Sequence, residues 1–457
     1  MRKRLVAGLA GVALAVGLVG CGRGSSGRPG APSATTIARS QAAPAGSVTY
    51  VAGSTQKVCQ LTGETDDETG QLTSSQTASR FGYKSGDLGY SFTYNNQLWF
   101  LFGDSRPTLR FKGQPNTEGR SPYDPQAWGN DAVAYATARG GDGCPILDFV
   151  PQTTGAVGAY TNPSVTLDGT AVSLRNYEVP VSGISVDGSM YVIFATDKPP
   201  CPGTCVPNTS GFATRSVIGV LADPATLQFR GLYNFSAPPT PFAGGAKFVN
   251  VAIASGNDGW VYFWGTEGGT GYRRSPAFLA RVRAADIATP GSLDYLTGIN
   301  SDGTPDFVAG SESAAQPLFH DEPDDCMGEL GVEWDSVIGR WVMLYNCADR
   351  TASNLSGIYM RTAPHPWGPW SPAQTIFNPV RDHGYCSFIH RGGSPPCDHL
   401  STSSQSGGGY APYFLAGWTT GTPATATTPA TSTFYYTLST WIPYTQVIMK
   451  STVEEDG

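Results

Sequence analysis

Two aspartates next to short apolar segments are the residues best placed for chemistry in this sequence. Asp104 directly follows LWFLFG at residues 98–103, and Asp131 opens the next apolar segment in WGNDAVAYAT. The ends of neighbouring antiparallel strands lie close together, so both carboxylates can reach one site. Glycoside hydrolysis needs such a pair, because one carboxyl protonates the leaving oxygen while the other acts as nucleophile or activates water. The sequence predicts the pair without assigning the two roles.

Side chains around this pair are candidates for holding a sugar. Arg106, Trp128 and Asn130 flank the two aspartates, and we expect them to contact the substrate. Acidic residues beside other apolar segments can hold a sugar hydroxyl or tune the pKa of a catalytic group. The substrate-binding candidates among them are Glu178 and Glu333, and the remaining ones are Glu267 and Glu329.

Several of these residues also have ordinary structural interpretations. Gly-Asp and Asn-Asp are common turn pairs, so each aspartate can simply end or begin a strand. Asp187 and Asp258 are expected to be turn residues only. The segment PWGPW at residues 366–370 is interpreted as a structural turn rather than a surface on which sugars stack.

One pattern recurs five times and indicates the elements that position the acids. A turn leads into an apolar segment that is hydrophobic on both faces. The five segments are LWFLFGD, SMYVIFATD, WVYFWGTE, RWVMLYNC and YAPYFLAGW. Their spacing averages roughly eighty residues, so each copy is one unit with long loops. Short β-branched and aromatic runs alternate with turn residues throughout, which is typical of an all-β chain.

Strands that are apolar on both faces need cover on both sides. Radially stacked blades provide that cover without helices, so the five copies predict an all-β fold, a five-bladed β-propeller. We expect LWFLF to be the innermost strand of its blade and a strand near residues 57–61 to complete the last blade. The low-complexity segment 421–433 is predicted to be an exposed hairpin loop. The alternative architecture is a pair of β-sandwich domains.

The nine cysteines divide into one near the start and eight in the remaining chain. An even number in an exported chain predicts four disulfides. Pairing of cysteines that are close in sequence, with the last pair left by elimination, gives Cys201–Cys205, Cys326–Cys347, Cys386–Cys397 and Cys59–Cys144.

The composition limits the classes of partner that we expect. The net charge is −7, only 14% of residues are charged, and no basic stripe appears, so nucleic acid is not an expected partner. Abundant aromatic, glycine and proline residues favour an exported protein that handles a polysaccharide. The five histidines match no familiar zinc spacing, so we expect no metal and no cofactor, and we expect a monomer.

The first residues read as an export signal. MRKR precedes an apolar run that is too short for a comfortable membrane span and ends at Cys21. We therefore predict a lipoprotein signal peptide at 1–20, a lipid anchor on Cys21 and a Gly-, Ser- and Pro-rich tether at 21–46. The glycosidase-like propeller would then occupy 47–457, outside the cell membrane. The alternative is an ordinary secretory signal.

Several motifs together resemble one known family. YSFTYNNQLWFLFGDS, ELGVEWDSVIGRWVMLYNC, PWGPWS and LSTWIPY are similar to the domain of unknown function 4185 family, over about residues 55–452. That family is related to five-bladed propeller glycosidases and is similar to glycoside hydrolase family 183, whose members are endo-acting D-arabinanases.

The resemblance implies a specific activity. It implies cleavage of internal furanosidic links in the D-arabinan of arabinogalactan or lipoarabinomannan. It also implies two catalytic aspartates, which match Asp104 and Asp131. The alternatives are a propeller glycosidase for another sugar and a non-catalytic, glycan-binding surface lipoprotein.

Overall fold

The computed structural model describes most of the chain from Gly46 onward. The described ranges are 46–107, 130–151, 160–175, 177–197, 213–239, 245–268, 275–320, 325–348, 355–393, 397, 399–401 and 403–456. Several predictions lie outside the described residues, namely the signal peptide, the tether up to residue 45, the anchor on Cys21, the role of Trp128 and the Cys201–Cys205 bridge. In the described ranges, no helix combines the length and hydropathy needed to cross a membrane.

The described strands form five sheets, which are the blades of a five-bladed β-propeller. Blade I has the order β3-β4-β5-β6, with bounds Tyr83–Tyr94, Gln97–Pro107, Asn130–Arg139 and Pro145–Phe149. Blade II has the order β9-β10-β11-β12-β7-β8, with bounds Pro180–Val186, Ser189–Thr196, Arg215–Asp223, Gln228–Ser236, Ser164–Leu167 and Thr170–Ala171.

The other three blades follow the same plan. Blade III is β13-β14-β15-β16-β17, with bounds Asn250–Ser255, Trp260–Thr266, Phe278–Arg283, Asp294–Ile299 and Pro305–Ala309. Blade IV is β18-β19-β20-β21, with bounds Met327–Asp335, Arg340–Ala348, Leu355–Ala363 and Gln374–Phe377. Blade V joins β22, β24 and β25 to β1, β2 and β23, with bounds Gly409–Phe414, Thr431–Thr440, Gln446–Glu455, Val48–Tyr50, Gln56–Gln60 and Thr420–Thr422.

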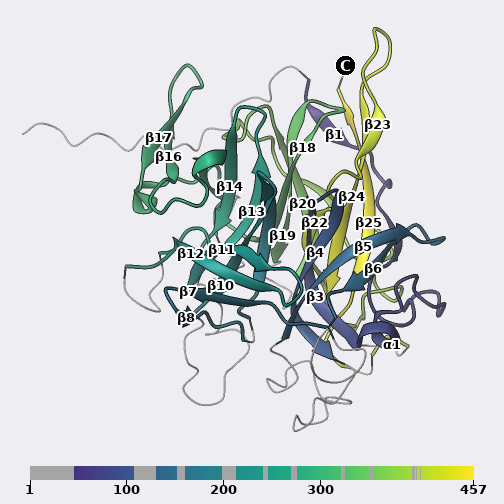
Figure 1. The fold of residues 1–457 in the computed structure, drawn as a ribbon. Coiled ribbons are helices and arrows are strands. Elements are labelled where there is room, and N and C mark those ends of the chain that lie inside the picture. Colours follow the sequence, from purple (N-terminus) through teal and green to yellow (C-terminus); the bar gives the residue numbers. More distant parts are fainter. Residues whose placement is uncertain are drawn as a thin grey trace, which may run out of the picture. The chain divides into compact units, whose positions relative to one another are not determined.

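The ring is closed by strands from both ends of the described chain. The first strands of the blades, β3, β9, β13, β18 and β22, pack against one another in cyclic order around the centre. β1 and β2 pair antiparallel with β25, so the start of the domain completes the last blade (Figure 1). Both the propeller and its closing strand were predicted from the sequence, and both predictions are confirmed.

The place of the apolar repeat differs from the prediction. LWFLF lies in β4, the second strand of blade I, and not in the innermost strand. The second, third and fourth copies also lie in second strands, β10, β14 and β19, whereas the fifth lies in β22, a first strand. A second strand has partners on both sides and a neighbouring blade over each face, so it can be apolar throughout. Phe100, Leu101 and Phe102 are accordingly all fully buried.

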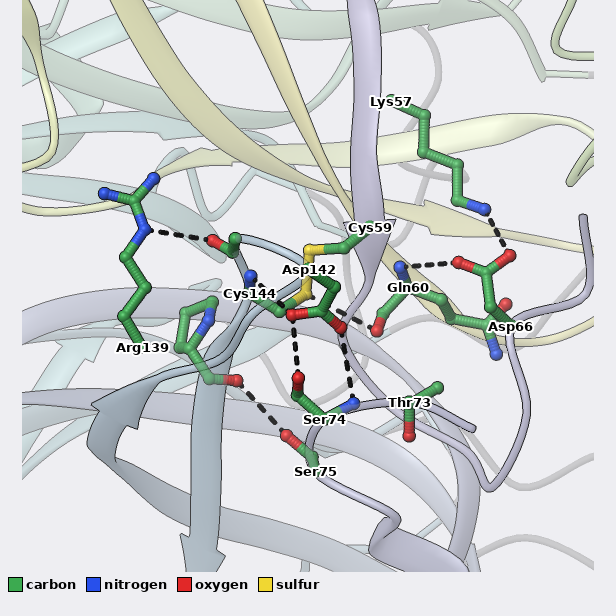
Figure 2. Close-up of a disulfide and its surroundings, with 12 residues drawn as sticks. Lys57, Cys59, Gln60, Asp66, Thr73, Ser74, Ser75, Arg139, Asp142 and Cys144 are labelled. Carbon is green, nitrogen blue, oxygen red and sulfur yellow. Dashed lines mark hydrogen bonds and ion pairs between the residues drawn. A yellow bond between two sulfur atoms is a disulfide. The ribbon is translucent and has the colours of Figure 1, made fainter. Parts of the chain in front are cut away.

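Three disulfides hold the described part of the domain, as predicted. They are Cys59–Cys144, Cys326–Cys347 and Cys386–Cys397. The first joins β2 of the closing blade to the start of β6 in blade I, where Asp142 also accepts a hydrogen bond from Ser74 (Figure 2). This bridge therefore fixes the junction at which the ring closes.

Three turns and loops also match the sequence predictions. Asp187 lies in a tight turn with φ of 49°, and Asp258 caps its own turn by accepting the Trp260 N–H at 3.1 Å. The Thr- and Pro-rich residues between β23 and β24 are exposed and form a hairpin (Figure 1). None of these residues contributes to the central site.

Candidate functional site

A cavity of about 70 Å³ lies where the five inner strands begin. Every blade contributes to its wall, through the starts of first strands and the ends of second strands. Its acidic lining residues come from three of the blades and are Asp87, Asp104, Glu267 and Glu329. Its aromatic lining residues are Tyr177, Tyr410 and Trp441. Converging carboxylates with aromatic side chains around them are the composition expected of a site that cleaves sugars.

Asp87 and Asp104 face this cavity from neighbouring strands. Asp87 pairs across the sheet with Gly103, the residue directly before Asp104. The pairing register shifts on both sides of Asp87, and again beside Asp104 in its pairing with β5. Such bulges turn a side chain away from its ordinary direction. Asp104 also has φ of 41°, an uncommon backbone conformation for a residue other than glycine.

Glycines make room for the two carboxylates. A Cβ atom added at Gly103 would lie 3.0 Å from Oδ1 of Asp87 and 2.8 Å from Val179. One added at Gly86 would lie 2.2 Å from the Tyr83 hydroxyl. The Gly-Asp pairs at 86–87 and 103–104 are therefore more than turn signals, because each glycine permits close approach of groups around the site.

The Asp104 carboxylate is held by backbone from the next blade. The Tyr177 N–H donates to Oδ1 at 2.9 Å and lies 3.2 Å from Oδ2. Asp104 is only 2% exposed, although it lines the cavity. A backbone donor aimed at a carboxylate favours its ionised form.

Asp87 lies in a different environment. The Tyr410 hydroxyl donates to Oδ2 at 3.0 Å. Burial raises the pKa of Asp87 to about 7, against the opposing effects of the Tyr444 and Tyr410 hydroxyls and of the Arg106 charge. At neutral pH this carboxyl is therefore protonated in a substantial share of molecules.

Asp131 lies behind Asp104 and does not line the cavity. Its Oδ1 accepts the backbone N–H of Asp104 at 3.2 Å, and its side chain is 4% exposed. Burial, and then the charge of Asp104, raise the pKa of Asp131 well above its ordinary value. The two aspartates predicted from the sequence are thus in contact, but only one of them reaches the open site.

The remaining predicted contacts are distributed around the pair. Arg106 lies with its guanidinium carbon 4.5 Å from the Tyr444 ring centre, close to Asp87. Glu178 is buried and accepts the Ser173 hydroxyl and, at 3.0 Å, the Arg175 N–H. Glu178 therefore shapes the turn that presents the Tyr177 N–H.

Asn130 and Glu333 are the last two predicted contacts. Asn130 pairs through its backbone with Ser105, and its side chain lies outside the described atoms. Glu333 does not join the pair, because it lines a second cavity farther along β18. Glu329, four positions earlier on the same strand, is the glutamate that lines the site.

Several residues of the site were not predicted from the sequence, among them Asp87, Tyr177, Tyr410 and Trp441. Asp87 follows a glycine just as Asp104 does, and this repeated Gly-Asp pair was the available signal. Tyr410 and Trp441 come from blade V, far along the chain, and no local pattern links them to Asp87. Trp441 is partly exposed, so its ring offers a face for a sugar.

Among the residues described, no group of three or more His, Cys, Asp or Glu side chains is arranged to hold a metal ion. Glu267 and Glu329 line the cavity with the aspartates but do not form such a cluster. The described site brings carboxyl groups and the Tyr410 hydroxyl together.

Comparison with known proteins gives one family and several distant structures. A family model described as a domain of unknown function (DUF4185) matches residues 73–450. No curated protein matches the chain.

Similar solved structures include three carbohydrate-active enzymes. An exo-beta-1,3-galactanase from Phanerochaete chrysosporium is 10% identical with a TM-score of 0.42, and the match covers 87% of this chain and 64% of that chain. A GH43_1 enzyme from Xanthomonas citri is 12% identical with a TM-score of 0.39, and the match covers 83% of this chain and 92% of that chain. A GH43 beta-xylosidase/alpha-arabinofuranosidase from a compost microbial metagenome is 10% identical with a TM-score of 0.37, and the match covers 80% of this chain and 91% of that chain. Likeness this distant carries no inference about activity.

Proposed function

Because the chain belongs to the DUF4185 family and places a pair of carboxylates in one central cavity, we propose that it is a glycoside hydrolase. The observation that carries the proposal is the pairing of Asp87 with Gly103, since it brings the Asp87 and Asp104 side chains into the same cavity. Two carboxyl groups on either side of a scissile bond are the shared requirement of most glycoside hydrolases.

We assign the two proposed roles from the two environments. Asp87 is the general acid, because burial raises its pKa to about 7 and keeps a proton available for the leaving oxygen. Asp104 is the nucleophile or base, because the Tyr177 N–H stabilises its ionised form. Asp131 is a positioning residue that holds the Asp104 backbone through a hydrogen bond. This assignment replaces the pair Asp104 and Asp131 with the pair Asp87 and Asp104.

We further propose that the substrate is a D-arabinan cleaved at internal furanosidic links. The sequence motifs that resemble endo-D-arabinanases support this choice, and LSTWIPY among them contains the cavity residue Trp441. A lipid anchor on Cys21 would hold the enzyme against an envelope polysaccharide. Beside its carboxyl groups the cavity has aromatic and apolar wall residues such as Trp441 and Val179, which suit a neutral glycan.

The test uses purified protein and a D-arabinan polysaccharide, with released oligosaccharides measured by mass spectrometry and reducing-end assay. Asp87→Asn and Asp104→Asn should each lower the rate about 10²- to 10⁴-fold, the usual contribution of a positioned acid or base. Asp131→Asn keeps an acceptor oxygen for the Asp104 N–H, so it should lower the hydrolysis rate less than Asp87→Asn or Asp104→Asn does. Asp187→Asn, which changes an exposed turn acid, should match the unsubstituted protein.

Other outcomes separate the alternatives. Release that survives Asp87→Asn would remove Asp87 from the reaction, and an equal loss in Asp131→Asn would restore the pair predicted from the sequence. Release from a different polysaccharide, but not from D-arabinan, would keep the hydrolase and change its substrate. Binding of polysaccharides without any release would favour a glycan-binding protein.

A further inference from the structure

A second, larger cavity lies in the middle of the propeller, beyond the acidic site. Its volume is about 250 Å³, and all five inner strands line it. Glu329 lines the first cavity and Glu333 the second, and four residues of strand separate them by about 13 Å at about 3.3 Å per residue. The two cavities therefore occupy different levels of the same ring of strands.

Four neighbouring blades each place one uncommitted polar side chain in this second cavity. They are Thr93 on β3, Ser185 on β9, Ser255 on β13 and Glu333 on β18. Within the described residues, none of these four side chains has a hydrogen bond or an ion pair. Ser185 and Glu333 are partly buried, so a ligand or water in the cavity would supply their hydrogen bonds, whereas Thr93 and Ser255 lie at its exposed rim.

The other polar groups of this wall are already engaged. Ser91 donates to the Phe414 carbonyl at 2.7 Å and accepts the Ala416 N–H at 3.1 Å. The Tyr90 hydroxyl donates to the Ile253 carbonyl at 2.9 Å. These bonds join inner strands of different blades and hold the cavity wall in place. The four remaining polar groups stay available to a ligand.

We propose that this cavity is a second carbohydrate site, which binds one sugar ring of a neutral glycan. Three hydroxyls and one carboxyl match the hydroxyl groups of a sugar, while Tyr90, Phe92 and Phe414 supply apolar walls. The volume lies below the about 300 Å³ from which ordinary ligand pockets start, so one ring fits better than a chain. Thr93, Ser255 and Gly417 are exposed and give access from solvent.

A cation is a poorer match for this cavity. Among the described residues that line it, Glu333 is the only acidic one, and burial, followed by the charge of Asp335, raises the pKa of Glu333 to about 8. A carboxyl that is protonated at neutral pH both donates and accepts, which suits a sugar hydroxyl rather than a positive charge. No described group of three acidic or histidine side chains forms a metal site there.

The choice of sugars rests on the proposed function, whereas the existence of the second cavity does not. The experiment therefore measures binding in a variant that should not hydrolyse the ligand. The full chain with Asp104→Asn is titrated with methyl glycosides of arabinofuranose, xylose, galactose and glucose, by calorimetry and ligand-observed NMR. At least one should bind, and Glu333→Ala should weaken its binding about two- to tenfold, the loss expected for a hydrogen bond to an uncharged group. Ser255→Trp, which blocks the exposed rim, should abolish binding.

Two matched variants and one ion complete the test. Asp187→Asn removes a charge at the turn that leads out of β9, and Trp441→Ala alters the acidic site; neither should change the affinity. Glu333→Gln serves as the milder substitution if Glu333→Ala does not fold. The proposal is overturned if no methyl glycoside binds, if binding is insensitive to Glu333→Ala and Ser255→Trp, or if calcium chloride binds in a Glu333-dependent manner instead.

Discussion

At the scale of single residues, the proposed reaction depends on one carboxyl that keeps its proton near neutral pH. Asp87 meets this need because it is partly buried among Tyr410, Tyr444 and Arg106, which together hold its pKa at about 7 rather than higher. Asp104 lies one residue beyond the cross-strand partner of Asp87 and receives a backbone N–H instead. Two carboxyls of the same type thus lie in different surroundings, one beside tyrosine hydroxyls and the other beside a backbone N–H.

The first prediction concerns the pH profile of hydrolysis. If Asp87 is the acid, kcat/KM should fall as pH rises through about 7, because the proton is then lost. Tyr410→Phe removes a hydroxyl that stabilises the ionised form, so the alkaline limb should move upward by about one pH unit. Tyr435→Phe, outside the site, is the control. An unmoved limb in Tyr410→Phe would argue against Asp87 as the titrating group.

The second prediction concerns Glu333 and stability. Its pKa is raised from 4.5 to about 8 by burial and the charge of Asp335, and the Tyr90 hydroxyl of β3 is a further titratable neighbour. The folded protein therefore holds a proton that the unfolded chain releases, and the free energy of unfolding falls as pH rises between these values. Glu333→Gln should raise Tm more at pH 8 than at pH 5 in thermal unfolding. An equal change at both pH values would contradict a buried, protonated Glu333.

At the scale of elements, the site is made by the bulged pairing of β3 with β4. The register shifts around Asp87, and the left-handed conformation of Asp104 turns both side chains toward the ring centre. The apolar run of β4 anchors this geometry, because Phe100, Leu101 and Phe102 are fully buried between neighbouring blades. Gly86 leaves space for the Tyr83 hydroxyl, and Gly103 leaves space for the Asp87 carboxylate.

The third prediction tests this packing. Gly103→Ala brings a Cβ atom to 2.8 Å from Val179 and 2.9 Å from Leu88, so it should destabilise the fold by about 1–3 kcal/mol and reduce activity. Gly141→Ala is the matched control, since its added Cβ meets nothing within 4 Å, and it should stay within about 0.5 kcal/mol. Urea unfolding and the hydrolysis assay measure both. A neutral Gly103→Ala would show that the strands can separate there.

At the scale of the whole domain, closure of the ring makes the site possible. The cavity wall comes from all five blades, and the residues nearest Asp87 include Tyr410 from the other end of the chain. β1, β2 and the Cys59–Cys144 bridge lock the first and last blades together. Loosening this junction should disturb the site, although none of these residues touches it.

The fourth prediction compares two disulfides. Cys59 and Cys144 are 85 residues apart and Cys386 and Cys397 are 11 apart. Removing each bridge by replacing both of its cysteines with alanine should lower the free energy of unfolding by about 4.5 kcal/mol for the first and about 3 kcal/mol for the second, on the basis of chain entropy. The first change should also lower activity more. Denaturant unfolding of the two variants provides the measurement, and an equal or reversed order would show that closure is held by strand pairing alone.

The sequence by itself determined the fold class, the number of blades, the closing strand and three of the disulfides, and it predicted Asp104, which lines the central cavity. These follow from local signals: apolar segments, turns, cysteine spacing and an acid directly after a strand. Only the tertiary structure decided that LWFLF is a second strand and that Asp87 and Trp441 join Asp104 in the cavity. It also decided that Asp131 lies behind that pair and Glu333 in another cavity. The reason is physical: pairing register, bulges and ring closure set the direction of a side chain, and each depends on residues far away in the sequence.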